Sequence, residues 1–397
     1  MFKTKLGILP KLFIAIGLGV VVGLVVKAGI FGASGSVIRA LNCFGFTFGQ
    51  FIRFFVPFIV LGLVTPAIAE TGSGAGRLLL ITMGIAYAST MFAGGFAFCA
   101  ADAVFPRVIS GVVDSAAQVQ SFPAYFVLEI PPVMGITTAL FTAFIFGLAM
   151  VRLDAPNLKR VFLEAREVVT LTINKVFLPL LPFYILAVIA DLTASGKLAA
   201  VGGSCIVIMV TAFCVTTLVL LAQYLVAGLV AGRNPLKALW NMLPAYLTGW
   251  GCCSSAATLP VTLRQTRKNG VDDKIADLVI PLCANVHLAG SMANMVVYTA
   301  GFVVLFGGEI SVVKYIHFML LLSVIAVASP GIPGGVVLAS ATIAETTLGF
   351  SPERYALVIA TYMALDGMGT ACNLTGDGAI ALIVDRLHRG GRRGVAE

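Results

Sequence analysis

The chain has 397 residues, of which 59% are hydrophobic and only 11% are charged. A soluble domain carries about 25% charged residues, so this composition excludes an ordinary soluble protein. Apolar runs long enough to cross a bilayer as helices recur along the chain, which also excludes a β-barrel of short alternating strands. The sequence therefore predicts an all-α polytopic membrane protein.

Basic residues are distributed unevenly among the expected loops. With eight crossings, most Lys and Arg residues fall on one side of the membrane, from Lys3 and Lys5 at the start to Arg392 and Arg393 in the tail. This positive-inside asymmetry predicts a bacterial-type inner-membrane protein with its N- and C-termini in the cytoplasm. Because topology accounts for the net charge of +8, we expect membrane lipid and no nucleic acid among its partners.

The N-terminal region, residues 1–232, contains long and nearly uninterrupted apolar runs. Each run is about as long as the hydrocarbon thickness of a bilayer requires. We expect six transmembrane helices here, at Lys11–Lys27, Leu41–Ala69, Leu78–Val104, Tyr125–Val151, Val168–Leu192 and Leu198–Ala231.

After Arg233 the apolar segments are shorter and are interrupted by Gly, Pro and Ser. Trp240–Arg264 and Tyr315–Leu348 each have such a break in the middle and are too short for two crossings, which predicts two re-entrant helical hairpins. Irregular backbone at membrane depth is tolerated where it lines a binding site. The alternative is a pair of ordinary kinked spans.

Each hairpin is followed by one further span, Ile275–Phe306 and Glu353–Leu387. The repeated order of hairpin and helix is an internal repeat, and it brings the expected total to eight transmembrane helices plus two hairpins. Residues 233–387 would then form a transport core, followed by a basic cytoplasmic tail at 388–397.

The last helix carries polar residues on one face. Asp366, Thr370, Asn373 and Asp377 are spaced by four, three and four positions, so they share a helical face. Intramembrane carboxylates are costly, and they usually mark a substrate or ion path. One carboxylate can pair with an ammonium group, the amide can donate to a carboxylate, and the second carboxylate can ligate a monovalent ion. For Asp377 the alternative is a solvated position near the interface.

Residues 249–384 resemble the dicarboxylate/amino acid:cation symporter family of glutamate transporter homologues. The resemblance covers about a third of the chain. It rests on Ser254–Thr262, Pro281-Leu282, Leu288–Ser291, Gly331–Gly334, Leu365-Asp366 and Asn373–Asp377. It implies a homotrimer with an elevator mechanism and inverted repeats, in which a mobile transport part moves against a scaffold. The third and sixth helices of the N-terminal region would belong to the transport part.

The resemblance also implies roles for individual residues. Substrate would be held by the hairpin, seventh-helix and eighth-helix positions Ser254, Ser255, Ser291, Gly331, Pro333, Gly334, Asp366, Gly369, Thr370 and Asn373. Asp366 would bind the ammonium group, Asn373 the α-carboxylate, and Gly331–Gly334 would form the extracellular gate. Sodium would be bound, partly through backbone carbonyls, at His287, Ser329, Asn373 and Asp377.

Departures from the family pattern indicate the substrate. Gly369 and Cys253 stand where members that carry acidic substrates place an Arg, so a second carboxylate would be buried without a partner. The expected substrate is therefore a neutral L-amino acid, with extra space at Gly369 for its side chain. Ala289 replaces the Asp of a third sodium site, for which Ser89 and Thr90 are the remaining candidates, so we expect fewer sodium ions per substrate.

Several alternatives remain at this point. His287 replaces the usual Asn and either carries a proton or stays a neutral hydrogen-bonding imidazole, the second being favoured because desolvation opposes its charging. A proton-coupled symporter or a sodium-independent amino-acid exchanger of the same fold is the runner-up to sodium symport. A channel would need a filter, and an enzyme would need a nucleophile and base that the three histidines do not supply. We expect no enzyme activity and no organic cofactor.

Overall fold

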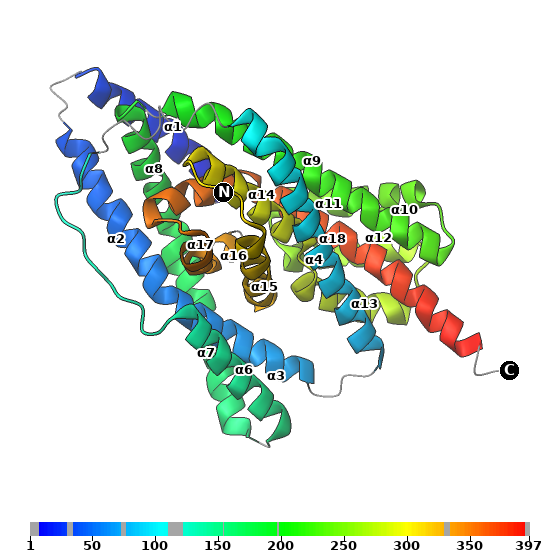
Figure 1. Ribbon diagram of the computed structural model, residues 1–397. Helices are drawn as coiled ribbons and strands as arrows, with labels where there is room; N and C mark the ends of the chain where they lie inside the picture. Colours follow the sequence, from blue (N-terminus) through cyan, green and yellow to red (C-terminus); the bar gives the residue numbers. More distant parts are fainter. Residues whose placement is uncertain are drawn as a thin grey trace, which may run out of the picture.

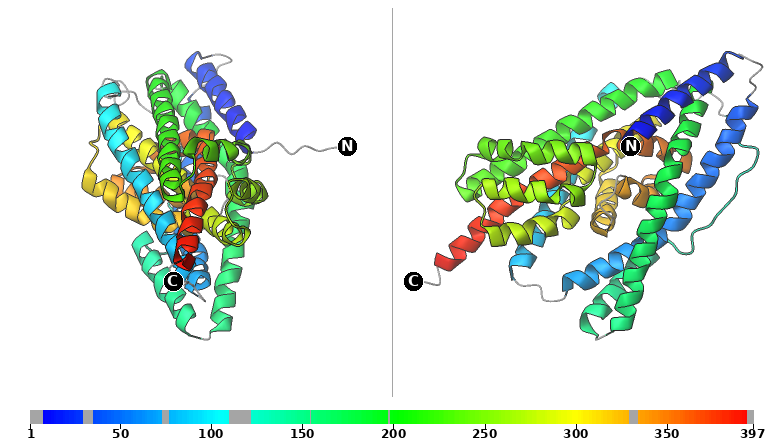
Figure 2. Two further views of the ribbon diagram at one scale, coloured as in Figure 1. Left: turned by 90° about the vertical axis from the view of Figure 1, so that its right-hand side faces the viewer. Right: turned by 180° about the vertical axis from the view of Figure 1, so that it is seen from behind.

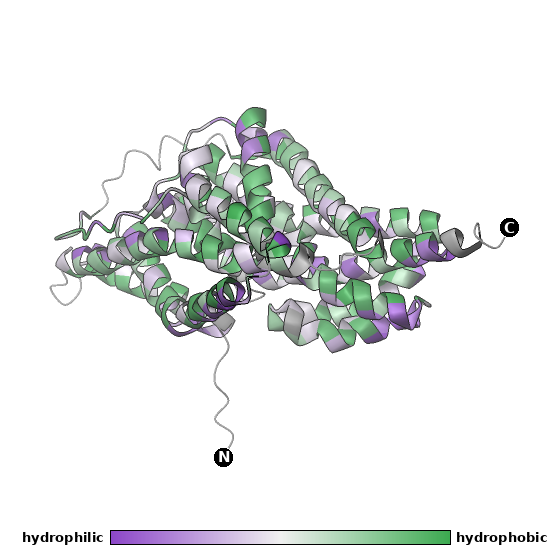
Figure 3. Ribbon diagram, turned by 90° about the horizontal axis from the view of Figure 1, so that it is seen from below, coloured by the Kyte–Doolittle hydropathy of each residue, from purple (hydrophilic) through white to green (hydrophobic). Residues whose placement is uncertain are grey.

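The computed structural model describes residues 8–29, 35–72, 77–109, 122–153, 155–196, 198–328 and 334–393. Every regular element among these residues is a helix, which confirms the predicted all-helical class. Six helices are long and apolar enough to cross a membrane: Pro10–Lys27, Ser36–Val64, Leu78–Val108, Pro156–Ala194, Val201–Ala231 and Asp273–Leu305. Apolar residues cover most helices, including their outer faces (Figure 3).

One group of helices contains α1, α2 and α8, and its members α3, α6 and α7 lie at the opposite end from α1 (Figures 1 and 2). α1 lies along α8, and α2 packs on α8 from another side. α2 continues through a π-helical turn, η2, into α3, and α7 continues through η3 into α8. The bounds are α1 Ile8–Lys27, α2 Ser36–Ile59, η2 Val60–Val64, α3 Thr65–Gly72, α6 Ile136–Arg152, α7 Pro156–Thr172, η3 Ile173–Phe177 and α8 Leu178–Ala194. We call these helices the peripheral group.

The fourth expected span differs from the prediction. Residues 122–135 are irregular, and only Ile136–Arg152 is helical. Pro123, Pro131 and Pro132 lack the N–H groups that a helix needs, which explains why this apolar stretch does not continue the helix. In addition, α7 begins at Pro156, so basic residues expected in a loop before the fifth span are helical.

A second group surrounds α14 and α18. α4 and α9 both pack on α14, and α9, α11 and α13 pack on α18. We call this the core group, and its C-terminal end projects beyond the other helices (Figure 1). The bounds are α4 Arg77–Val108, α9 Leu198–Ala231, α10 Pro235–Asn241, α11 Leu243–Cys252, α12 Ser255–Lys268, α13 Asp273–Val286, α14 Ala289–Leu305, α15 Val312–Ala328, α16 Gly335–Ala339, α17 Ala341–Leu348 and α18 Pro352–Arg393.

The helices of the core group are interrupted where the sequence analysis placed polar residues. α11 and α12 are joined by a reversal at Cys253, which has the left-handed φ of 50°. The expected seventh helix breaks at His287 and Leu288, between α13 and α14. α18 is kinked at Leu365 and then runs on to Arg393, through the first part of the expected tail. Such breaks leave backbone N–H and C=O groups available for ligands.

Candidate functional site

A small cavity lies where the α11–α12 segment and the α15–α16 segment meet α13, α14 and α18. Five of the residues predicted to bind substrate line it together: Ser255, Ser291, Asp366, Thr370 and Asn373. Asp366 is the one charged residue among the described residues of the lining.

Asp366 is buried and held from two directions. Its Oδ2 accepts a hydrogen bond of 2.8 Å from the backbone N–H of Gly334, which has the left-handed φ of 73°. The hydroxyl of Tyr362, one turn earlier on α18, interacts with both Asp366 and Ser291. Gly334 thereby links the start of α16 to α18 at the cavity.

Asn373 is fixed by the start of α14. Its Oδ1 accepts from the backbone N–H groups of Gly290 and Ser291, at 2.8 and 3.3 Å. Its Nδ2 donates to Ser291 Oγ at 2.9 Å, so the second N–H of the amide remains for a ligand. Gly290 permits this approach, since a Cβ at that position would lie 2.5 Å from the carbonyl oxygen of Gly369.

His287 and Asp377 form a buried pair beside Asn373. His287 Nδ1 lies 2.9 Å from Asp377 Oδ1 and 3.2 Å from the Asn373 carbonyl oxygen, and both are acceptors, so Nδ1 carries a proton. Nε2 lies 3.2 Å from Gln223 Nε2 and 3.1 Å from Ser89 Oγ. Asp377 Oδ2 has no hydrogen-bond partner within the described part of the chain.

The other predicted site residues have separate positions. Ser254 caps α12, because its side chain accepts the N–H of Ala257 at 3.4 Å, and it does not line the cavity. Ser89 and Thr90 lie at the α13–α14 break, where Thr90 Oγ1 accepts the N–H of Leu288 at 3.2 Å. The predicted positions Ser329, Gly331 and Pro333 lie outside the described residues.

Gly369 does not open the free space that the sequence analysis expected. A Cβ at this position would lie 2.9 Å from Asn294 Nδ2, so the amide of Asn294 takes up that space. The sequence analysis missed Tyr362, which lines the cavity. Helical spacing could have found it, since Tyr362 precedes Asp366 by four positions.

Comparison with known proteins gives related transporters along the chain. A protein of Acinetobacter baumannii named serine/threonine transporter SstT is 26% identical over 406 residues, which cover 98% of each chain. Its namesake from Streptococcus suis is 24% identical over 350 residues, covering 84% of this chain and 93% of the relative. The neutral amino acid transporter B(0) of Mus musculus is 30% identical over 172 residues, or 42% of this chain and 31% of the relative.

The family comparison covers nearly the whole sequence. The sequence model described as the sodium:dicarboxylate symporter family matches residues 8–387. This match extends the resemblance of the C-terminal third to the N-terminal helices, and it agrees with the multi-pass helical architecture. The chain belongs to the sodium:dicarboxylate symporter family.

Proposed function

We propose that this protein is a secondary active transporter that carries a neutral L-amino acid across the membrane together with sodium. One observation carries the proposal. The Asp366 carboxylate and the Asn373 amide both line one cavity, and the described lining of this cavity contains no Lys or Arg. Relatives named as serine/threonine and neutral amino acid transporters support amino-acid symport.

The two ends of an amino-acid backbone have matching groups in this cavity. The ammonium group pairs with Oδ1 of Asp366, since Oδ2 is the oxygen that accepts the N–H of Gly334. The α-carboxylate accepts the remaining N–H of Asn373 and lies at the N-terminus of α12, where Ser255 lines the cavity. Helix N-termini favour anions because their first N–H groups are unpaired and the helix dipole is positive there.

The cavity disfavours an acidic substrate. A side-chain carboxylate would enter a site that already contains Asp366 and has no described cationic side chain to balance it. Removing one partner of a buried ion pair destabilises a protein by about 3–5 kcal/mol, because the remaining charge has no partner. A substrate carboxylate buried without a cation would have a cost of this size. Aspartate, glutamate and C4-dicarboxylates should therefore bind far more weakly than neutral amino acids.

Asp377 is the proposed anchor of a sodium site. Its Oδ2 and the hydroxyl of Thr375 are buried and find no partner in the described part of the chain, as expected of oxygens that receive a cation. Carbonyl groups near Asn373 and around Ser329 would complete the sodium sites. Ala289 supplies no oxygen at the third position, so fewer sodium ions would accompany each substrate.

A second candidate is a proton-coupled symporter or a sodium-independent exchanger of the same fold. It is favoured by the contact of 2.9 Å between His287 and Asp377, because an imidazolium there would replace a cation. Sodium coupling remains the first proposal, because the observed contacts of His287 do not require a charged ring. A neutral imidazole can donate from Nδ1 to Asp377 and accept from Gln223 at Nε2. Uptake by His287→Asn over a range of pH, in constant sodium, separates the two: an unchanged profile excludes proton carriage by His287.

The transport movement proposed is that of an elevator. In this proposal α1, α2 and α8 belong to a trimeric scaffold, and the core group moves against it with two re-entrant hairpins, of which Gly331, Pro333 and Gly334 gate the site. Eight crossings and cytoplasmic termini complete the arrangement. The two groups touch less extensively than the helices within each group, which supports this proposal, and their contacts include an ion pair of 2.7 Å between Arg53 of α2 and Glu345 of α17.

The experiment that tests the proposal is a thermal-shift panel of the purified protein. All common amino acids and C4-dicarboxylates are compared in sodium and in choline buffers, with Asp366→Asn as the binding-deficient control. A ligand at 100 times its Kd stabilises by about 2.7 kcal/mol, which such a measurement resolves. Stabilisation by neutral amino acids only in sodium is the expected result. Equal stabilisation in choline points to the second candidate, and a response to aspartate contradicts the proposed substrate class.

A further inference from the structure

A second cavity, which we call the lateral cavity, lies in the core group between α4, α9 and α18. Its volume is about 320 Å³, many times the space that one water molecule needs. It shares no described lining residue with the substrate cavity, and no described residue of the peripheral group lines it. The proposed substrate contacts therefore do not use this space.

The lining of the lateral cavity is apolar except for Ser89 and Gln223. Gln223 Nε2 donates to Ser89 Oγ at 2.9 Å, and both groups lie within 3.2 Å of His287 Nε2. Gln223 Oε1 is turned toward α18, since a Cβ at Gly376 would come within 2.5 Å of it. Because these polar groups are directed at one another, at His287 and at α18, the surface offered to an occupant is apolar. A buried water needs about two to four polar partners, so the cavity favours an apolar occupant.

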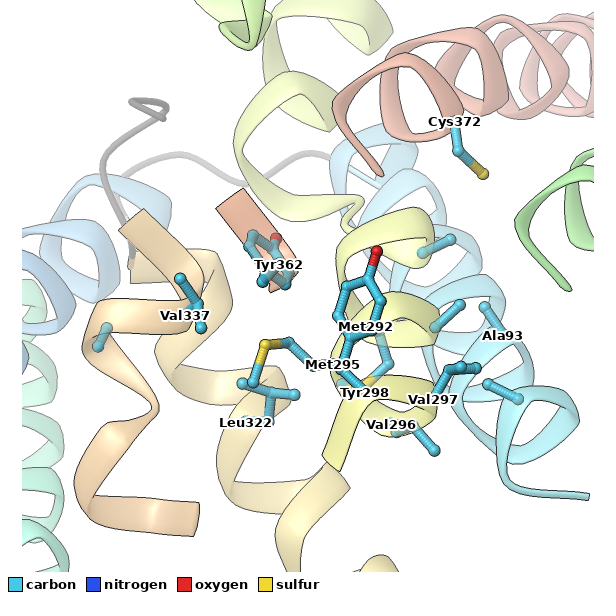
Figure 4. Packing of buried hydrophobic residues seen from close by; sticks show 14 of the residues in the cluster. Ala93, Met292, Met295, Val296, Val297, Tyr298, Leu322, Val337, Tyr362 and Cys372 are labelled. Carbon is cyan, nitrogen blue, oxygen red and sulfur yellow. The ribbon is translucent and has the colours of Figure 1, made fainter. Parts of the chain in front are cut away.

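α4 has one closely packed face and one face that borders the lateral cavity. On the packed face Ala93 is completely buried and lies beside Val296 and Val297 of α14 (Figure 4). On the other face Phe92 is 54% exposed, and Val226 on the α9 side of the cavity is 53% exposed. Both helices belong to stretches that are long and apolar enough to cross a membrane. The lateral cavity therefore opens to the hydrocarbon region of the bilayer, where acyl chains surround the protein.

A basic side chain follows the cavity on α18. Ala379, Ile383 and Arg386 are spaced by four and three positions, so Arg386 continues the face of α18 that lines the cavity. Three residues of helix advance by about 4.5 Å, which places Arg386 just beyond the lining. Arg386 is exposed, whereas Arg389 on the following turn forms an ion pair with Asp385. An anionic group at this end of the cavity would have a cationic partner.

We propose that the lateral cavity binds one acyl chain of an anionic phospholipid, with the phosphate of the headgroup at Arg386. The apolar lining contacts the acyl chain, and the basic side chain selects the charge of the headgroup. Anionic lipids are abundant in the cytoplasmic leaflet, which is the side proposed for the C-terminal end of α18. The bound acyl chain lies beside Ser89 and Gln223, next to His287, and the site does not depend on which substrate is carried.

Lipid binding is measured by native mass spectrometry of the whole protein in detergent. Phosphatidylglycerol and phosphatidylcholine with the same acyl chains are the two probes, and a dissociation constant is obtained for each. One basic residue near a membrane surface strengthens the binding of anionic lipid about 5-fold, so phosphatidylglycerol should bind more tightly by about that factor. Excess glycerol 3-phosphate has the anionic phosphate without acyl chains and should not displace the lipid. Displacement would show that the site takes a free phosphate, which overturns the proposal.

Two variants fill the lateral cavity. Ala88→Phe and Ala222→Phe each place a ring in the space of the acyl chain. Each should weaken both lipids by at least about 10-fold, because excluding about two methylene groups has an effect of that size. The two positions lie on different helices, so one variant tests the cavity if the other does not fold. Ala103→Phe is the matched control: it makes the same change at an exposed position farther along α4 and should leave both constants unchanged.

A third variant tests the headgroup. Arg386→Gln should remove the preference for phosphatidylglycerol and leave phosphatidylcholine binding unchanged, whereas Arg264→Gln, the same change at an exposed position of α12, should keep the preference. Unchanged lipid binding in both cavity-filling variants would overturn the assignment to the lateral cavity, and a preference retained in Arg386→Gln would overturn the headgroup assignment. An equal loss in Ala103→Phe and Ala88→Phe would show general lipid coating of α4, which also overturns the proposal.

Discussion

α1 and α14 are both apolar helices, yet they occupy opposite environments. In the apolar stretch that contains α1, 28% of the residues are buried inside the protein, against 89% for the stretch that contains α14. The exposed side of α1 carries large apolar residues such as Phe13 and Leu18. α14 instead contains Gly290, Ser291 and Asn294 where it meets α18.

The difference shows what each group of helices requires. Most positions on a helix of the peripheral group need only lipid or apolar partners, since the backbone is satisfied within the helix. A helix of the core group carries polar side chains and a broken backbone, each of which needs a specific partner. Substitutions of the same type should therefore affect binding in the core group and only stability in the peripheral group.

The largest effect is expected for the buried carboxylates. Asp366→Asn removes the charge that pairs with the substrate ammonium, which costs about 2–5 kcal/mol, or roughly 30- to 5,000-fold in Kd. Asp191→Asn is the control in the peripheral group, where Asp191 accepts from Asn42 and from the Phe122 N–H. Calorimetric titration should show intact affinity in that control, and retained affinity in Asp366→Asn would remove the basis of the proposed function.

A smaller effect is expected for the buried amides. Asn373→Ala removes a donor to the α-carboxylate, and a hydrogen bond to a charged group contributes about 1.5–3 kcal/mol, or roughly 10- to 150-fold in Kd. Asn42→Ala removes a peripheral amide that donates to Phe122 O at 2.7 Å. It should lower the melting temperature and leave Kd unchanged. Equal losses of affinity in both variants would contradict the division into two groups.

A glycine substitution should destabilise the core group more than the peripheral group. Gly290→Ala places a Cβ 2.5 Å from Gly369 O and 2.6 Å from Cys372 Cβ, and such overpacking costs about 1–3 kcal/mol. Gly17→Ala adds a Cβ on α1 that meets nothing within 4 Å. Thermal unfolding in one detergent should show a clear loss for the first variant and little change for the second. A tolerated Gly290→Ala would mean that α14 and α18 are more loosely packed than described.

The smallest effect concerns the boundary of the two groups. Arg53 and Glu345 are partly exposed, and ion pairs of this kind contribute about 0–1 kcal/mol. A double-mutant cycle with Arg53→Ala and Glu345→Ala should give a coupling energy in that range, decreasing with salt. A much larger coupling would indicate that the two groups do not move separately.

The sequence by itself determined the class of the molecule and the main features of the site. Long apolar runs require helices in a bilayer because backbone groups must be satisfied internally there. The spacing of Asp366, Thr370 and Asn373 placed them on one helical face, and all three line one cavity. Periodicity of this kind depends only on local geometry, so it can be read without the fold.

Only the tertiary structure decided how closely the distant segments approach one another at the site. The sequence did not indicate that Asn294 fills the space at Gly369, because this depends on the close approach of α14 and α18. Nor did it indicate that residues 122–135 leave the helical path, or that the His287 ring bonds to Asp377 through Nδ1 and faces Gln223 through Nε2. Such contacts depend on how helices are placed against one another, whereas the sequence pattern reports only which face of each helix is polar.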